Sequence, residues 1–308
     1  MRLAIQTKRK IYIYLGVILF TTLFPYIVTI ICMQNTNTRI YEPKDSGRTI
    51  RLTKEVSMDL EKFLPCVLYA SLPYDYPREA LKTQLVILRT YILRKMGDEK
   101  EIEVTKLELP YIGYSDLERE WGSEYENRYN EAMGLVQETN LQVMFYEGDL
   151  IYPYYHEISE GTTCVGEFTY LQPAVSSEDS TADNYLSIFY FTPEEVSEIC
   201  KNQWGVNVAG TDLLSQIAIE KYENCNYVSR VKIGEQEISP ENFMQAFALA
   251  STSFAVEEFA QGIKMVCKGV GSGKGVSIYG ACCMAEQGSD YRDILCHYYT
   301  GIEIGQMR

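Results

Sequence analysis

Positive charge is scarce in this sequence, which has 28 lysines and arginines against 42 aspartates and glutamates and a formal net charge of −14. A chain with this balance lacks the basic surface that binds a phosphate backbone, so nucleic acid is not an expected partner. The same deficit argues against adhesion to anionic lipid or polymer by charge alone. A neutral ligand, or one matched by a local group of charges, stays open.

Nucleotide-binding motifs are also absent, although residues 269–281, GVGSGKGVSIYGA, are rich in glycine. A Walker loop needs a glycine five positions before its Gly-Lys pair and a Ser or Thr after the lysine. Here Lys268 and Gly275 fill those two positions. The dinucleotide fingerprint needs a third glycine three positions after the second, where this segment has Lys274 or Val276. The glycines therefore serve a purpose other than cradling a nucleotide.

Paired cysteine motifs are missing, although the chain has 9 cysteines and no CxxC sequence connects any of them. A protein that faces outward would use cysteines in disulfides, whereas a reducing habitat would leave them as free, buried thiols. Adjacent Cys282 and Cys283 are poorly placed to bridge each other. The spacing leaves both alternatives open.

Charge is absent from residues 11–33, IYIYLGVILFTTLFPYIVTIICM. As a helix this run would extend about 35 Å, enough to cross a hydrocarbon core of about 30 Å. A cleaved signal peptide would have a shorter apolar region and a small-residue cleavage site, so we predict a transmembrane helix. The basic side chains among residues 1–10 predict a cytoplasmic tail. The chain is then a single-pass protein of the cell membrane, with an extracellular or intermembrane domain.

The remaining chain predicts a linker at residues 34–55 and an ectodomain at residues 56–304, with one core or two subdomains. Residues 77–96 predict a buried helix, because their middle is apolar nearly all round. Residues 141–155 predict two strands joined by a turn, and residues 227–249 predict a strand, a turn and a helix capped by Ser239. The fold class is therefore α+β, with mixed helices and antiparallel strands. The polar residues 174–184 predict an exposed loop.

Three segments carry a family resemblance: LPYDYPREALKTQLVILRTYILRKM; WGSEYENRYNEAM with YPYYHEISEGTT; and MQAFALASTSF with the glycine segment and YGACCMAEQGSDYRDILCHYYTGIEI. In this order they resemble the stage II sporulation protein D family, which is related to the amidase enhancers of bacterial cell walls. The resemblance covers about residues 55–304. It implies membrane-anchored peptidoglycan remodelling during engulfment of the forespore. Enzymatic members are lytic transglycosylases that act on glycan strands stripped of peptides, beside a second wall hydrolase and a polytopic membrane protein.

The resemblance also assigns candidate site residues. The glycine segment keeps the family frame G-x-G-H-G-x-G-M-S-Q-x-G-A, although Ser272 replaces the histidine and Ile278 replaces the glutamine. The candidate substrate-binding residues are Gly271, Ser272, Gly273, Gly275, Ser277 and Tyr279, together with Arg89 of the family's A-R-T motif. Arg89 could equally pair with a buried carboxylate or carbonyl. We expect the glycine segment to pack against the turn at Ser71 and to form one wall of a groove.

The family's catalytic glutamate is replaced by Ser71. A lytic transglycosylase uses one carboxyl group first as an acid and then as a base, which a serine hydroxyl cannot do without a neighbouring base. The sequence therefore predicts a pseudoenzyme that holds glycan or positions another hydrolase. The alternative is an active transglycosylase that uses Asp75 or Glu79. The ordinary roles of these two residues are to cap a helix and to place negative charge at its N-terminus.

No cofactor is implied by the family resemblance, but a zinc site can be considered. His156 and Cys164 lie near each other in the sequence and could both be ligands. Zinc needs three or four ligands, so a hydrogen-bonded histidine at a sheet edge is the competing interpretation of His156. The other histidine, His297, lies among aromatic residues in the sequence, so we expect it to pack in the core or on the surface and not to bind a metal.

Overall fold

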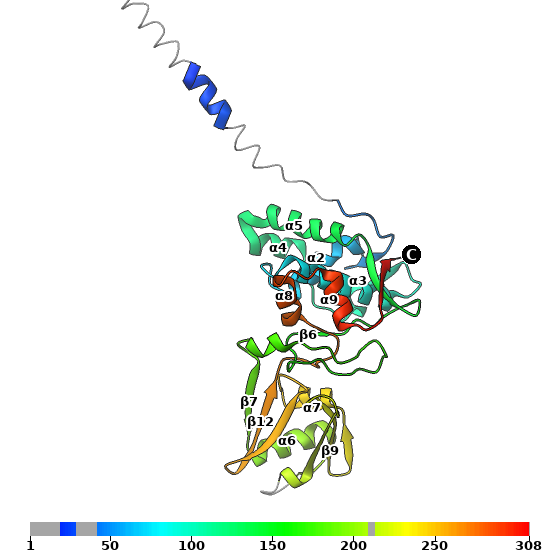
Figure 1. Ribbon diagram of the computed structural model, residues 1–308, viewed down its shortest axis with the longest axis vertical. Coiled ribbons are helices and arrows are strands. Elements are labelled where there is room, and N and C mark those ends of the chain that lie inside the picture. Colours follow the sequence, from blue (N-terminus) through cyan, green and yellow to red (C-terminus); the bar gives the residue numbers. More distant parts are fainter. Residues whose placement is uncertain (1–18, 29–41, 209–212, 308) are drawn as a thin grey trace, which may run out of the picture.

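The computed structural model describes residues 19–28, 42–208 and 213–307 (Figure 1). Residues 19–28 form a helix. None of the helices in these described ranges is long and apolar enough to cross a membrane. The rest of the predicted transmembrane run, residues 11–33, lies outside the described residues, as does the tail at residues 1–10.

Two lobes, each with its own hydrophobic core, lie one beyond the other along the long axis (Figure 1). The first lobe is built from residues 42–181 and 276–307, and the second from residues 186–208 and 213–268. The second lobe is thus inserted in the sequence of the first. Residues 269–275, the glycine loop, connect the two where the chain returns.

The first lobe contains most of the helices. Its elements are β1 (Thr49–Arg51), β2 (Ser57–Asp59), α2 (Leu60–Ser71), α3 (Arg78–Met96), β3 (Glu101–Glu103), η1 (Val104–Lys106), α4 (Tyr114–Trp121), η2 (Gly122–Glu124), α5 (Tyr125–Glu138), β4 (Gln142–Tyr146), β5 (Asp149–Leu150), β6 (Tyr155–His156), η3 (Ser177–Thr181), β13 (Val276–Ser277), α8 (Ile278–Glu286), α9 (Tyr291–Tyr298) and β14 (Glu303–Gln306). Its sheets have the strand orders β2-β1-β3, β14-β4-β5 and β13-β6.

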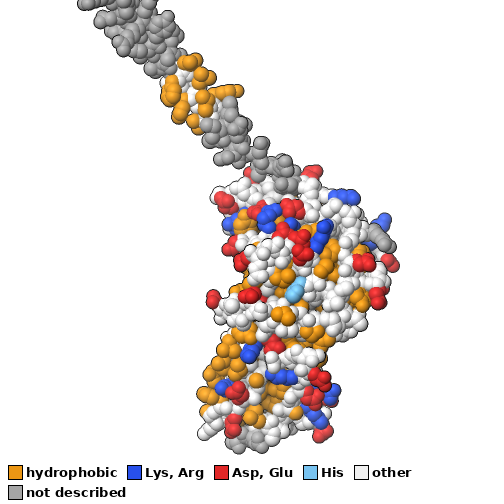
Figure 2. All heavy atoms as spheres, in the orientation of Figure 1, with side chains coloured by type: hydrophobic (Ala, Val, Ile, Leu, Met, Phe, Trp, Pro, Cys, Tyr) orange, Lys and Arg blue, Asp and Glu red, His pale blue; other side chains and the backbone are white. Residues whose placement is uncertain are grey.

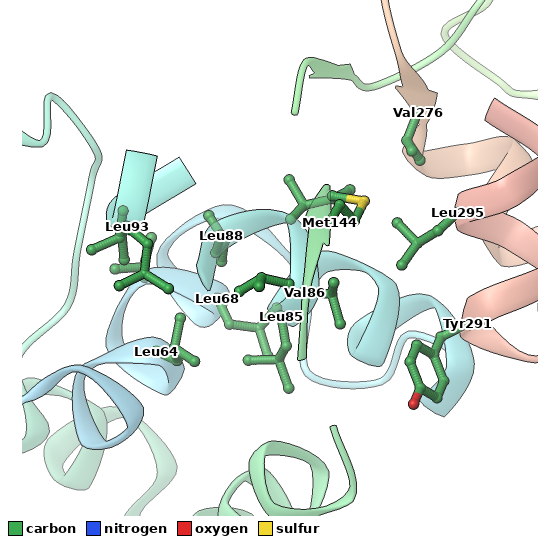
Figure 3. Packing of buried hydrophobic residues seen from close by; sticks show 14 of the residues in the cluster. Leu64, Leu68, Leu85, Val86, Leu88, Leu93, Met144, Val276, Tyr291 and Leu295 are labelled. Atoms are coloured by element: carbon green, nitrogen blue, oxygen red, sulfur yellow. The ribbon is translucent and has the colours of Figure 1, made fainter. Parts of the chain in front are cut away.

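Helix α3 lies at the centre of the first lobe, as its apolar sequence predicts. Its residues 85–88 are all fully buried, because α2, α5, α8, α9 and β4 pack around it. Figure 3 shows Leu64 and Leu68 of α2 beside Leu85 of α3, with Met144 of β4 close by. The predicted hairpin is confirmed, because β4 and β5 pair antiparallel and join through Glu147 and Gly148, both at positive φ.

The second lobe is a mixed α+β unit of two antiparallel sheets and two helices. Its elements are β7 (Leu186–Phe191), α6 (Pro193–Trp204), η4 (Leu214–Gln216), β8 (Ile217–Lys221), β9 (Val228–Ile233), β10 (Gln236–Ile238), α7 (Pro240–Ala246), β11 (Phe254–Phe259) and β12 (Gly262–Lys268). The strand orders are β10-β9-β8 and β11-β12-β7. The predicted cap is confirmed, since Ser239 Oγ accepts a hydrogen bond from the Asn242 amide over 3.2 Å. Figure 2 shows exposed hydrophobic side chains on this lobe. Tyr190 of β7 and Phe259 of β11 are both exposed.

Two local predictions differ from the structure. The predicted linker, residues 34–55, overlaps β1, where Ile50 is fully buried and pairs with Met58 of β2. The folded domain therefore begins before residue 56. The sequence did not predict this strand, because a single inward-facing apolar residue in a polar stretch is a weak pattern. The predicted loop at residues 174–184 is largely exposed, but it contains η3, and Ser176 and Asp179 within it are buried. Their polar side chains face inward because they hydrogen-bond there.

Candidate functional site

Ser71 is the last residue of α2, and its side chain is exposed at the edge of a pocket of about 520 Å³. The pocket is lined by the turn at residues 69–75, by Leu117, Glu120 and Trp121 of α4, and by Arg128 of α5. The turn forms because Leu72 takes an extended conformation, which ends α2. The Leu72 amide still donates a hydrogen bond to the carbonyl oxygen of Leu68. Pro73 and Pro77 then keep the chain from continuing as a helix until α3 begins.

Three aromatic residues, Tyr69, Tyr74 and Trp121, line the Ser71 pocket. The rings of Tyr69 and Trp121 meet edge to face with centroids 5.2 Å apart, and the ring of Tyr74 lies 6.2 Å from that of Trp121. The guanidinium of Arg128 lies over the Tyr74 ring at 4.3 Å. Burial raises the pKa of Tyr69, so its hydroxyl stays protonated, and this buried hydroxyl has no hydrogen-bond partner among the described residues. The pocket therefore offers aromatic ring surface and one cation.

The acids that could replace the family's glutamate occupy different places. Asp75 and Glu120 both line the pocket, but both side chains are exposed. Glu79 does not line it; Oε2 of Glu79 accepts a hydrogen bond from the Tyr291 amide at the start of α9 over 3.0 Å, and Oε1 pairs with Lys82. The interpretation of Asp75 as a helix cap is wrong, because α3 begins after Pro77 and has no side-chain cap.

Arg89 is not available to a substrate, contrary to its assignment as a substrate-binding residue. It is fully buried and forms a two-bond pair with Glu61, with distances of 2.7 and 2.8 Å. Arg89 also donates to the hydroxyl of Thr139 and to the carbonyl oxygen of Gln142. It thereby joins α3 to α2, α5 and β4, which is the structural role that the sequence left open.

The glycine loop packs closely against other segments of the same chain, mainly residues 154–159 and Tyr227. Gly269, Gly271, Gly273 and Gly275 all have positive φ. A Cβ atom on Gly275 would lie 1.8 Å from the carbonyl oxygen of Tyr154, and one on Gly273 would lie 2.2 Å from the ring of Tyr227. Both positions therefore require glycine for close approach as well as for conformation. This packing explains the alternating glycines without any ligand.

The polar side chains of the glycine segment point to internal partners. Ser277 is fully buried, donates to Asp179 Oδ2 over 2.6 Å and caps α8 by accepting from the Gly280 amide. The Tyr279 hydroxyl lies 3.0 Å from that of Thr181. The Ser272 hydroxyl accepts from the Lys274 amide over 3.4 Å. No residue of 269–281 is among the described residues that line the Ser71 pocket, so the expected groove wall is absent there.

Tyr155 forms the link between Ser71 and the glycine segment, and it was missed from the sequence. It pairs with Val276 in the parallel β6–β13 ladder. Burial raises the pKa of Tyr155, while the nearby polar side chains of Gln84 and Ser71 lower it. Gln84 is fully buried, and both polar atoms of its amide lack ordinary hydrogen-bond partners within the described chain. A glutamine inside the apolar sequence of α3 was the signal that could have found this group.

The two zinc candidates do not meet in a cluster. Nδ1 of His156 donates to the carbonyl oxygen of Lys274 over 3.0 Å, and burial lowers the pKa of His156 to about 4. Cys164 lies beside Cys225, with a distance of 4.0 Å between the sulfur atoms. Within the described ranges, no group of three or more His, Cys, Asp or Glu side chains is placed to hold a metal ion.

The segment that carries the pocket is also the segment that a family comparison identifies. A protein-family model described as "Stage II sporulation protein" matches residues 48–146, which include every residue that lines the Ser71 pocket. Stage II sporulation protein D of Bacillus amyloliquefaciens is 28% identical over 264 residues, covering 81% of this chain and 75% of that protein. The same protein of Bacillus subtilis (strain 168) is 25% identical with the same coverage. The family match and these relatives support membership of the stage II sporulation protein D family, at modest identity.

Its position in the family is divergent. An uncharacterized protein of Brachyspira hyodysenteriae is 25% identical over 256 residues, covering 80% of this chain and 67% of that relative. These alignments extend well beyond residue 146, so both lobes contribute to the similarity. The family model and the relatives support a sporulation protein of this family, which is what the sequence predicts.

Proposed function

We propose that this protein acts in peptidoglycan remodelling during engulfment, as a pseudoenzyme that binds glycan strands or positions another hydrolase without cleaving glycan itself. One observation carries the proposal. Ser71, at the position of the family's catalytic glutamate, is exposed at the edge of a pocket whose lining includes three aromatic residues. The chain has a pocket at this position, and a serine in place of the acid.

Binding is supported by the size and the surfaces of the pocket. Its volume of about 520 Å³ lies within the range of about 300–1,000 Å³ that small-molecule sites occupy. The C–H faces of sugar rings stack on aromatic rings, and Tyr74, which is half-buried, supplies such a ring at the pocket. Arg128, which lines the pocket, can pair with a sugar carboxylate. Arg128 thus gives the pocket a local positive charge, so an anionic polymer can bind there although the chain as a whole is negatively charged.

Loss of cleavage is supported by the surroundings of the carboxylates. A general acid at neutral pH needs a raised pKa, and burial is the usual cause of such a rise in a carboxylic acid. Asp75 and Glu120 lie in the pocket but are exposed to solvent. Glu79 is held by Lys82 and by the amide of Tyr291. General acid–base catalysis contributes about 10²- to 10⁴-fold in rate, and none of these acids has the setting for it.

The setting that we propose follows the family. Residues 11–33 would anchor the chain in the membrane, with residues 1–10 in the cytoplasm and both lobes outside. Peptidoglycan glycan strands are the proposed ligand. A second wall hydrolase and a polytopic membrane protein are the proposed partners.

Two measurements on the purified full-length chain test this function. Peptide-stripped glycan strands should bind, and no 1,6-anhydro sugar products should appear in the digest. Tyr74→Leu removes one stacking surface and should weaken binding by about tenfold, which corresponds to about 1.4 kcal/mol. Tyr190→Leu, an exposed aromatic residue of the second lobe, is the matched control and should leave binding unchanged. Equal binding by both variants would remove the pocket from the proposal.

The alternative is an active lytic transglycosylase, favoured by the presence of Asp75 and Glu120 in the pocket. If the wild-type chain releases anhydro products, Asp75→Asn and Glu120→Gln identify the acid. Glu118→Gln is the control, because Glu118 is an exposed carboxylate on the same helix as Glu120 and does not line the pocket. Activity that disappears in either pocket variant and persists in the control would establish the enzyme and exclude the pseudoenzyme.

A further inference from the structure

A polar seam joins the two lobes beside the glycine loop. Lys274 of that loop extends between Glu167 of the first lobe and Glu241 of the second, with distances of 3.5 and 3.2 Å. Glu160 of the first lobe accepts from the Asn226 amide over 2.6 Å and from the Ser253 hydroxyl over 3.1 Å. The seam thus depends on hydrogen bonds and ion pairs, which do not fix two bodies as firmly as a packed core.

Two cysteines face each other across this seam. Cys164 belongs to the first lobe, and its amide donates to the carbonyl oxygen of Gly273 in the glycine loop over 2.7 Å. Cys225 belongs to the turn between β8 and β9 of the second lobe, two residues before the Tyr227 ring that packs on Gly273. Their sulfur atoms lie 4.0 Å apart, although the residues are 61 positions apart in sequence.

We propose that Cys164 and Cys225 form a reversible disulfide that ties the two lobes together behind the glycine loop. A disulfide needs its sulfur atoms at about 2.05 Å, so the pair must close by about 2 Å. Side-chain rotation at Cys225 can supply this, because Cys225 lies in a turn and is only half-buried, whereas Cys164 is buried. The exposure of Cys225 also makes it the thiol that an oxidant reaches first.

The oxidant is a small-molecule disulfide or the disulfide of a thiol oxidoreductase. The Cys225 thiolate attacks one sulfur of that disulfide, forms a mixed disulfide and releases one thiol. The Cys164 sulfur, after losing its proton to solvent, then attacks Cys225 Sγ and expels the second thiol. Two protein thiols are oxidised and one external disulfide is reduced, so electrons and protons balance.

The other cysteines offer no comparable pair. Cys66, Cys200 and Cys267 are buried in the hydrophobic cores, and Cys296 is exposed. No other two cysteine sulfurs among residues 42–208 and 213–307 make a thiol–thiol hydrogen bond, so one crosslink is expected. The feature is independent of glycan binding, because neither cysteine lines the Ser71 pocket.

The test is a redox titration of the folded full-length chain with oxidised and reduced glutathione, in the presence of a metal chelator. Differential alkylation and peptide mass spectrometry should find a peptide pair linked through residues 164 and 225, 2 mass units lighter than the two free peptides. Cys225→Ser and Cys225→Ala should abolish this crosslink, while Cys296→Ser should leave it unchanged. The oxidised wild-type chain should unfold at a higher urea concentration than the reduced chain, and Cys225→Ser should lose this difference.

Two results would overturn the proposal. One is that both thiols remain free for alkylation at glutathione ratios that fully oxidise an exposed reference dithiol. The other is that Cys164 or Cys225 crosslinks mainly to a different cysteine in the folded chain. Both outcomes can be read without any glycan, so they are separate from success or failure of the proposed function.

Discussion

At the residue scale, His156 shows how burial changes the chemistry of one side chain. It is 4% exposed, its Nδ1 donates to Lys274, and its Nε2 has no partner among the described residues. Burial lowers the pKa of His156 to about 4, so the ring is neutral in the folded protein at neutral pH. An unfolded chain would bind a proton at this ring below about pH 6.5.

This difference predicts a loss of stability in acid. The unfolded state binds more protons below about pH 6.5, so the free energy of unfolding should fall as the pH drops from there towards 4. His156 should account for about 2 kcal/mol of the loss between pH 7 and pH 5. Urea unfolding at both pH values measures this loss. In His156→Asn, which keeps a hydrogen-bond donor for the Lys274 carbonyl, the free energy of unfolding should fall by about 2 kcal/mol less than in wild type. His297→Gln should lose as much as wild type, because His297 is exposed; equal losses in all three chains would contradict the prediction.

A second residue-scale prediction concerns the buried pair of Arg89 and Glu61, which are 0% and 1% exposed. Arg89→Met leaves the Glu61 carboxylate buried without its partner, and removing one member of such a pair typically costs about 3–5 kcal/mol. Urea unfolding should show this loss. The surface variant Arg78→Met breaks exposed contacts to Glu131 and Glu138 and should cost about 1 kcal/mol or less.

The double variant Glu61→Gln, Arg89→Met separates charge burial from loss of packing. It should be more stable than Arg89→Met alone, because no unpaired charge remains inside. A double variant at least as unstable as the single one would show that Arg89 acts through its contacts with Thr139 and Gln142 instead.

At the element scale, the glycine loop is shaped by the segment that it covers. Gly275 has a φ of 70°, and a Cβ there would clash with the carbonyl oxygen of Tyr154. Gly288, after α8, has a φ of 99° with open space where a Cβ would be. The two positions share a backbone conformation that favours glycine, but only one is also crowded.

This contrast makes a matched pair of variants. Gly288→Ala should cost about 1–2 kcal/mol, which is the usual penalty for an L residue in the left-handed region. Gly275→Ala should cost clearly more, because the β13–β6 pairing must also open to make room. Thermal unfolding measures both changes. Equal losses of stability would mean that the loop can shift to make room for the added methyl group. Glycine would then be required at Gly275 only for its backbone conformation.

The elements could be predicted from the sequence where the signal is local. The apolar α3, the Glu147-Gly148 turn and the Ser239 cap all depend on neighbours within a few residues. The burial of Asp179 could not be predicted, because its partner Ser277 lies 98 positions away. For the same reason the sequence identified the turn at Ser71 but not the α4 and α5 residues that complete the pocket.

At the scale of the whole molecule, the chain leaves the first lobe after η3 and returns to it at β13. Helices α8 and α9 then pack against α3, and the Tyr291 amide meets Glu79 across 212 positions. A sequence read in order suggests one ectodomain or two consecutive subdomains. An inserted lobe appears only when these long-range contacts are known, and it places the glycine loop at the junction.

The last prediction concerns the place of this two-lobed body in the cell. If residues 11–33 anchor the chain as proposed, the full-length protein should remain in the membrane pellet after extraction with alkaline carbonate. Protease added to protoplasts should digest both lobes and leave an epitope on residues 1–10 intact. Leu23→Asp with Ile27→Asp places two charges in the apolar run, each costing about 2.5–3.5 kcal/mol near the centre of a membrane helix. That variant should move to the soluble fraction, whereas Leu23→Ala with Ile27→Ala should stay with the membrane. Complete extraction of the wild-type chain by carbonate would show that it has no membrane anchor. An epitope at residues 300–307 that resists protease would show that the lobes do not face outward. Either result would mean that the lobes cannot contact the cell wall in the proposed way.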